Sequence, residues 1–98
     1  LLHLISLKDT KVLLNESFFA LAPNGFLIIY GPFMRNGKLT SKGDIDFHTS
    51  IRKRNNTLGY KNDVTLLKLV SKLGFLNVKT IEMPANNLAF VIQKTSNY

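Results

Sequence analysis

The sequence of 98 residues lacks cysteine and tryptophan and has only six acidic side chains. Without cysteine there is no disulfide, thiol nucleophile or thiolate metal site, which is typical of a reducing compartment. No apolar run reaches the roughly 18–20 residues that a membrane-spanning helix needs, and the opening apolar residues lack the basic stretch of a secretory signal. The two histidines and few carboxylates show no ligand spacing, so no metal site is expected. These absences predict a cytoplasmic or otherwise intracellular protein without a membrane partner.

The composition nevertheless provides for a hydrophobic core. Hydrophobic residues make up 45% of the chain and charged residues 19%, a balance that excludes wholesale disorder. The length corresponds to one small domain or to a piece of a larger one. Because the chain opens at Leu1 within an apolar run, we expect residues 1–98 to be a single partial domain, a fragment of a longer parent protein.

Positive charge is in excess and is concentrated in the middle of the chain. Thirteen Lys and Arg residues against six Asp and Glu give a net charge of +7. Most of the excess lies in the segment 35–61, with Arg35, Lys38, Lys42, Arg52, Lys53, Arg54 and Lys61 opposed by Asp44 and Asp46. Such a run is typical of a solvated face. RNA or another anion is the alternative partner, but the sequence does not favour nucleic acid, because only Phe47 and Tyr60 could stack on bases there.

The hydrophobic pattern predicts strands alternating with helices. The predicted elements are a strand over 1–5, a helix from Asp9 or Thr10 to about 22, a strand over 26–30, helices over 44–54 and 63–73, and strands over 77–83 and 88–92. Strand 26–30 is apolar on both alternating faces, so we expect helices on each side of it. The helix over 44–54 is expected to bury Phe47 and Ile51.

The last two predicted strands decide the topology. The turn 84–87 between them is too short for a parallel return, so they pair antiparallel. The more apolar strand, 88–92, is expected to insert between strand 26–30 and the edge strand 77–83. The fold class is therefore α/β, with one antiparallel strand inserted in an otherwise parallel sheet, as in the carboxyl-terminal half of a Rossmann-like class I methyltransferase domain.

Several short motifs resemble a known family. They are Tyr30-Gly31-Pro32-Phe33, Asn36-Gly37-Lys38, Asp46-Phe47, Arg52 with Arg54-Asn55, and Met83-Pro84-Ala85-Asn86-Asn87, with His3 and Thr10 fitting upstream. In this order and spacing the chain resembles the methyltransferase-like 26 family, an uncharacterised group related to S-adenosylmethionine-dependent methyltransferases. The resemblance covers only the second half of that family's domain. The chain departs from the family pattern at Ser6, Leu7, Gly43-Asp44, His48 and Leu58.

The resemblance implies S-adenosylmethionine as the cofactor of the full-length parent. The family's Gly-rich loop and the acidic residue that would hold the cofactor ribose have no counterpart here, and the six glycines are scattered singly. We therefore expect this chain alone to bind the cofactor weakly or not at all and to be inactive.

Three loops, 4–8, 31–42 and 84–87, are expected at the carboxyl edge of the sheet, where open α/β sheets bind ligands. Tyr30, Pro32, Phe33, Asn86 and Asn87 are candidate substrate contacts. For each of them a local structural role is the alternative: core packing for Tyr30, and turn formation for Pro32 and the two asparagines.

Three further residues, two near this edge and one on the helix predicted over 44–54, are candidates for other roles. His3 and Leu4 are candidate cofactor contacts. His3 and Tyr30 are weak catalytic candidates, and His48 is a further candidate base.

Three functions remain open from the sequence. The first is the acceptor-side half of an S-adenosylmethionine-dependent methyltransferase, whose acceptor, small or macromolecular, the sequence does not identify. The second is a non-catalytic protein that keeps the methyltransferase fold as a binding or scaffold module, and the third is an RNA-binding basic module. The enzyme assignment rests on resemblance, because fold alone does not assign a reaction.

Overall fold

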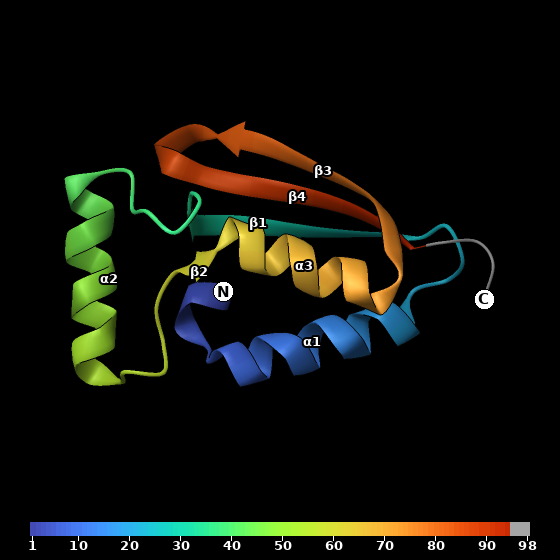
Figure 1. The fold of residues 1–98 in the computed structure, drawn as a ribbon, viewed down its shortest axis with the longest axis horizontal. Coiled ribbons are helices and arrows are strands. Elements are labelled where there is room, and N and C mark those ends of the chain that lie inside the picture. The colour runs from blue at the N-terminus through green and yellow to red at the C-terminus, as the bar shows by residue number, and fades with distance from the viewer. Residues whose placement is uncertain (95–98) are drawn as a thin grey trace.

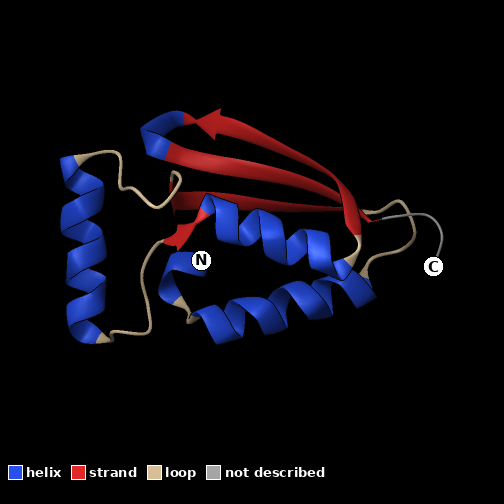
Figure 2. Cartoon of the chain, viewed as in Figure 1, coloured by secondary structure: helices blue, strands red, loops and turns tan. Residues whose placement is uncertain are grey.

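The structure is a computed structural model that describes residues 1–94, and it forms an α/β arrangement of one sheet and three α-helices (Figures 1 and 2). In chain order the elements are the 3₁₀ helix η1 (Leu2–Leu4), α1 (Leu7–Ala20), β1 (Phe26–Met34), α2 (Lys42–Arg54), β2 (Lys61–Asn62), α3 (Asp63–Leu73), β3 (Phe75–Met83), η2 (Pro84–Asn86) and β4 (Asn87–Lys94). Among these residues no helix is long and apolar enough to cross a membrane.

The sheet has the predicted topology. Its strand order is β2-β1-β4-β3, so the last strand lies between β1 and β3. β4 runs antiparallel to both neighbours, pairing Ile28 with Val91 on one side and Ile81 with Ala89 on the other. Both neighbours therefore run in the same direction, and the predicted inserted antiparallel strand is confirmed. The short strand β2 pairs parallel with the end of β1 and had not been predicted.

The hydrophobic core lies between the sheet and the helices α1 and α3, which cover the same face (Figure 1). Leu88, Phe90 and Ile92 of β4 are almost fully buried there, because their strand has a neighbour on each side and helices above it. Leu14 of α1 and Val70 of α3 pack against the same cluster. Burial of this one face is the main stabilising contribution to the fold.

The opposite face of the sheet is uncovered, which corrects the prediction for residues 26–30. Phe26, Ile28 and Tyr30 are 58%, 66% and 52% exposed, whereas the alternating residues Leu27 and Ile29 pack against the core. The prediction of helices on both sides of this strand was wrong, because α1 and α3 both lie on the Leu27 side and α2 stands beyond the end of the sheet (Figure 1).

The first residues also differ from the prediction. The predicted strand over 1–5 is instead the 3₁₀ helix η1. Helix α1 begins at Leu7 rather than at Asp9 or Thr10, because the hydroxyl of Ser6 accepts the Asp9 amide at 3.0 Å and caps the first turn. The predicted loop 4–8 is thereby reduced to a short link between two helices.

Helix α2 begins earlier and buries less than predicted. It starts at Lys42 rather than at residue 44, and Ser41 is its cap. Ile51 is buried as expected, but Phe47 is 47% exposed, so its predicted burial was wrong. Helix α3 has the predicted bounds and ends at Gly74, whose φ of 101° is left-handed.

Candidate functional site

Two of the three predicted loops meet at the carboxyl ends of β1 and β3. The loop predicted over 31–42 begins only after Met34, because β1 continues to that residue instead of ending at residue 30. Pro32 at the end of β1 is in register with Asn87, the residue at which β4 begins. The same asparagine is in register with Met83, the last residue of β3. The loop after β1 and the turn η2 therefore lie together at one edge of the sheet, because β4 joins them.

Tyr30 and Asn87 are in direct contact at this edge. The side-chain amide of Asn87 donates to the Tyr30 hydroxyl at 3.3 Å and to the Pro84 carbonyl at 3.2 Å. The ring of Tyr30 is half exposed on the open face of the sheet rather than packed in the core. The pair offers a hydroxyl and an amide to a polar ligand, as a site that orients a methyl acceptor requires.

The other candidate substrate residues are placed differently. Asn86 is exposed in the turn, with a positive φ of 60°. Pro32 is half-buried within β1. Phe33 is only 3% exposed, and its ring packs at 4.9 Å, centroid to centroid, on Phe90 in the core. The structure therefore places Phe33 behind the edge, where it supports the strand instead of lining an open surface.

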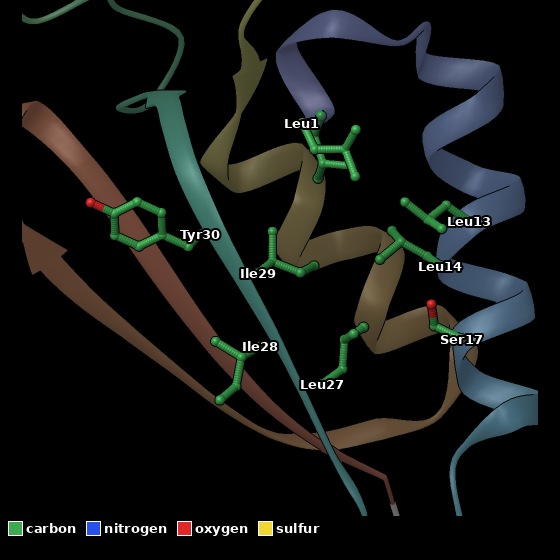
Figure 3. Close-up of a pocket in the computed structure, with 9 residues that line it drawn as sticks. Leu1, Leu13, Leu14, Ser17, Leu27, Ile28, Ile29 and Tyr30 are labelled. Atoms are coloured by element: carbon green, nitrogen blue, oxygen red, sulfur yellow. The ribbon is translucent and has the colours of Figure 1, made fainter.

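An apolar cavity of about 250 Å³ lies beside β1, on the side that has no strand partner between Phe26 and Pro32 within the described residues (Figure 3). Its lining comes from the amino terminus, α1 and β1: Leu1, Leu2, Leu13, Leu14, Ser17, Leu27, Ile28, Ile29 and Tyr30. Figure 3 shows Leu27 and Ile29 pointing toward the helices and Ile28 and Tyr30 pointing away from them. Apart from Ser17 and Tyr30 the lining is aliphatic, so the cavity suits an apolar group.

His3, in the 3₁₀ helix η1, belongs to a separate cluster around α2. The ring of His3 lies 5.7 Å from Phe47 and 6.0 Å from Tyr60, centroid to centroid. His48 accepts the backbone amide of Tyr60 on Nδ1 at 3.0 Å, and the Tyr60 hydroxyl donates to Asp44 at 2.7 Å. We call these five residues the α2 junction. They attach α2 to the segment before β2.

Burial controls the titration of the α2 junction. It lowers the pKa of His3, assisted by the positive charges of the amino terminus and Lys61. Burial also lowers the pKa of His48, with Arg52 and Lys61 adding to the effect. The pKa of Tyr60 is raised by burial first and then by its hydrogen bond to Asp44. Both imidazoles are therefore held neutral at pH 7, a state in which each can accept a proton or a hydrogen bond.

Tyr60 and Asp44 were missed as members of this cluster. Sixteen residues separate them, and no sequence spacing links a residue in the helix predicted over 44–54 to a tyrosine beyond its end. His48 was predicted as a candidate base, but its Nδ1 is already occupied by the Tyr60 amide. In the structure His48 instead supports the loop before β2 through this hydrogen bond.

The described residues do not build a cradle for S-adenosylmethionine. Such a cradle needs glycines where a ligand approaches the backbone closely. Here the six glycines lie singly, at least six residues apart, and none forms a G-x-G-x-x-G turn. Of the two predicted cofactor contacts, His3 is half-buried in the α2 junction and Leu4 is 51% exposed. No cluster of three or more metal-ligating side chains occurs in residues 1–94.

Comparison with known proteins assigns the chain to a family. Residues 1–94 match DUF938, described as a protein of unknown function. The chain belongs to the DUF938 family. This family is also known as methyltransferase-like 26-like, so the match supports the resemblance drawn from the sequence.

Solved structures with a similar fold include proteins named as methyltransferases. This DUF938 chain is similar to an O-methyltransferase family protein from Burkholderia thailandensis, with a TM-score of 0.82 and 16% identity over 99% of this chain and 29% of that one. It is similar to human N-acetylserotonin methyltransferase in complex with SAM (TM-score 0.79, 16% identity, 97% and 27% coverage). It is also similar to PigF with SAH (TM-score 0.82, 14% identity, 96% and 28% coverage). At these identities the likeness establishes the fold alone. The chain spans less than a third of the length of these structures.

Proposed function

We propose that this chain is the acceptor-side part of an S-adenosylmethionine-dependent methyltransferase domain. The observation that carries the proposal is the inserted strand β4, which brings the end of β1 and the turn η2 to one edge of the sheet. Similar folds in an O-methyltransferase family protein and in PigF with SAH support it. In this proposal the cofactor is bound by residues that this chain does not contain.

Tyr30 and Asn87 have the proposed role of orienting the acceptor. Methyl transfer requires a nucleophile in line with the sulfonium methyl group, so positioning provides much of the rate. A base is needed only when the acceptor is protonated. His3 is the proposed candidate for that role, because it is neutral and partly accessible.

Titration calorimetry of the full-length protein with S-adenosylmethionine tests the proposal. We expect saturable heat with the full-length protein and weak or no heat with residues 1–98 alone. Equal binding by the two chains would contradict the assignment of the cofactor site to residues outside this chain. The absence of binding by the full-length protein would contradict the methyltransferase proposal itself.

A non-catalytic binding module is the second proposed function. It is favoured by the structural roles of two departures from the family pattern, since Ser6 caps α1 and His48 accepts the Tyr60 amide. A full-length protein that folds cooperatively and does not bind S-adenosylmethionine would support this second function.

A further inference from the structure

Arg35 is held in a fixed position directly after β1. Its backbone pairs with Lys38 through hydrogen bonds of 2.8 and 3.1 Å, which closes a tight turn over residues 35–38. The amides of Asn36 and Gly37 donate to the side chains of Asp63 and Asn62, at 2.9 and 2.8 Å. The start of the loop is thereby tied to the start of α3, so the guanidinium group extends from a rigid base.

The guanidinium group of Arg35 joins three segments of the chain. It donates to the carbonyl of Phe33 at 2.6 Å and to the carbonyls of Asn86 and Asn87 at 3.0 and 3.5 Å. It also makes two hydrogen bonds to the Glu82 carboxylate, at 3.0 and 3.3 Å. The end of β1, the end of β3 and the turn η2 therefore share one side chain, which is only 19% exposed.

The turn that Arg35 contacts has an unfavourable backbone. Ala85 and Asn86 both have φ near 60°, in the left-handed region, which asparagine tolerates but which costs alanine roughly 1–2 kcal/mol. Such a turn persists only when its surroundings hold it. The carbonyls of the two residues that complete it, Asn86 and Asn87, both accept from Arg35.

We propose that Arg35 is a positioning residue that holds the turn η2 so that the Asn87 side-chain amide lies beside the Tyr30 hydroxyl. The inference rests on the proposed function only in treating Tyr30 and Asn87 as acceptor contacts. The guanidinium is suited to the task because it offers five donors in a planar fork, whereas an ammonium offers a single compact charge.

The carbonyl contacts, rather than the ion pair, carry this role. Glu82 is 74% exposed, and an ion pair with an exposed partner contributes little. Removing the Glu82 charge should therefore leave the turn nearly unchanged. Replacing Arg35 should release it.

Nuclear magnetic resonance of the full-length protein tests the proposal with R35K, E82Q and the control R52K. Within residues 1–94 the Arg52 side chain makes one hydrogen bond, to the Leu58 carbonyl, far from the turn in sequence. In R35K we expect the Asn87 side-chain amide signals to move toward those of a solvated amide. The backbone amide of Asn87, which donates to Pro84, should exchange at least tenfold faster. Protection in α3 should not change, which separates local positioning from a general loss of stability. E82Q and R52K should resemble the wild type.

Unchanged Asn87 signals in R35K, or an E82Q variant as perturbed as R35K, would overturn the proposal. If R35K does not fold, the wild-type protein still provides a test. Hydrogen-bonded Arg35 side-chain N–H groups should rotate and exchange slowly compared with those of Arg54, and fast rotation of the Arg35 group would also overturn it. Binding of S-adenosylmethionine, measured on the same samples, tests the proposed function separately. If R35K changes the Asn87 signals but the protein does not bind S-adenosylmethionine, the positioning role of Arg35 is supported and the methyltransferase proposal is contradicted.

Discussion

The phenol of Tyr60 connects the segment before β2 to the helix α2 through one hydrogen bond. Its residue is 7% exposed and its hydroxyl donates to the Asp44 carboxylate, which also accepts from Ser41 at 2.8 Å. A hydrogen bond to a charged group contributes more than one between neutral groups, and an acceptor left without its donor adds a desolvation cost. Tyr60 should therefore stabilise the α2 junction by more than its aromatic packing alone.

Replacing Tyr60 by Phe tests this contribution. We expect Tyr60→Phe to lower the free energy of unfolding by about 1.5 kcal/mol, because the ring remains and only the hydrogen bond to Asp44 is lost. Urea denaturation of the full-length protein measures the change. The matched control is Tyr30→Phe. The Tyr30 ring is half exposed and its hydroxyl accepts a longer hydrogen bond, at 3.3 Å, from Asn87. The free energy of unfolding of this control should stay within about 0.5 kcal/mol of the wild type. Equal losses in the two variants would contradict the assignment.

At the scale of elements, the glycine that ends α3 and the glycine in the first turn of α2 differ in whether their backbone conformation requires glycine. Gly74 ends α3 with a φ of 101°, and a Cβ there would lie 3.4 Å from the ring of Phe18. Gly43 lies in the first turn of α2, where a Cβ would be 3.9 Å from its nearest neighbour, the Ser41 hydroxyl. The first position needs glycine, whereas the second only tolerates it.

The same substitution at both positions should therefore change stability in opposite directions. Gly74→Ala should lower the free energy of unfolding by about 1–2 kcal/mol, since alanine disfavours the left-handed region. Gly43→Ala should raise it by about 0.5 kcal/mol, since alanine restricts the unfolded chain and favours helix. Thermal unfolding of the two variants side by side provides the measurement. A Gly74→Ala protein as stable as the wild type would show that α3 does not end in this conformation.

The α2 junction should also weaken in acid. His48 must be neutral for Nδ1 to accept the Tyr60 amide, and its pKa in the folded chain is lowered from 6.5 by burial, Arg52 and Lys61. A lowered histidine pKa means that the unfolded chain binds more protons, so the stabilisation is fully present above pH 6.5. It is lost as the pH falls from 6.5 through the lowered pKa of the folded state.

Urea midpoints between pH 5 and 8 check this prediction. His48→Gln keeps an acceptor without a titrating group, so its midpoint should depend less on pH than that of the wild type. The dependence should not vanish, because burial also lowers the pKa of His3. A His48→Gln variant with the full wild-type dependence would assign the effect to other groups.

How much the sequence predicts differs between the elements. The pairing of β3 and β4 was predictable because a short turn permits only an antiparallel return, and α3 was predictable because its apolar spacing and Gly74 mark its bounds. The 3₁₀ helix at Leu2–Leu4 was not, since a short apolar run reads alike as strand or helix. The α2 junction and the Arg35 contacts were not predictable either, because no local pattern links residues so far apart, such as Asp44 and Tyr60 at 16 positions or Arg35 and Asn87 at 52.

At the scale of the whole molecule, helices cover only one face of the sheet in residues 1–94. Phe26, Ile28 and Ile81 are exposed on the side opposite α1 and α3, at 58%, 66% and 40%. The edge of β1 beside the apolar cavity adds backbone groups without a strand partner among residues 1–94. Open apolar faces and unpaired edges are the usual sites of self-association.

We therefore expect the chain of 98 residues to self-associate through this face. Ile28→Lys should shift it toward the monomer, because a charge at the centre of the exposed patch cannot be buried against a second copy. The fold itself should be retained, since Ile28 makes no part of the core cluster. Sedimentation velocity at matched concentrations measures the shift. Thr49→Lys is the control, because it adds the same charge at an exposed position on α2.

Two outcomes would contradict this expectation. Monomeric wild-type protein with a cooperative thermal transition would show that the uncovered face needs no further partner. Equal association by Ile28→Lys and the wild type would place the contact elsewhere.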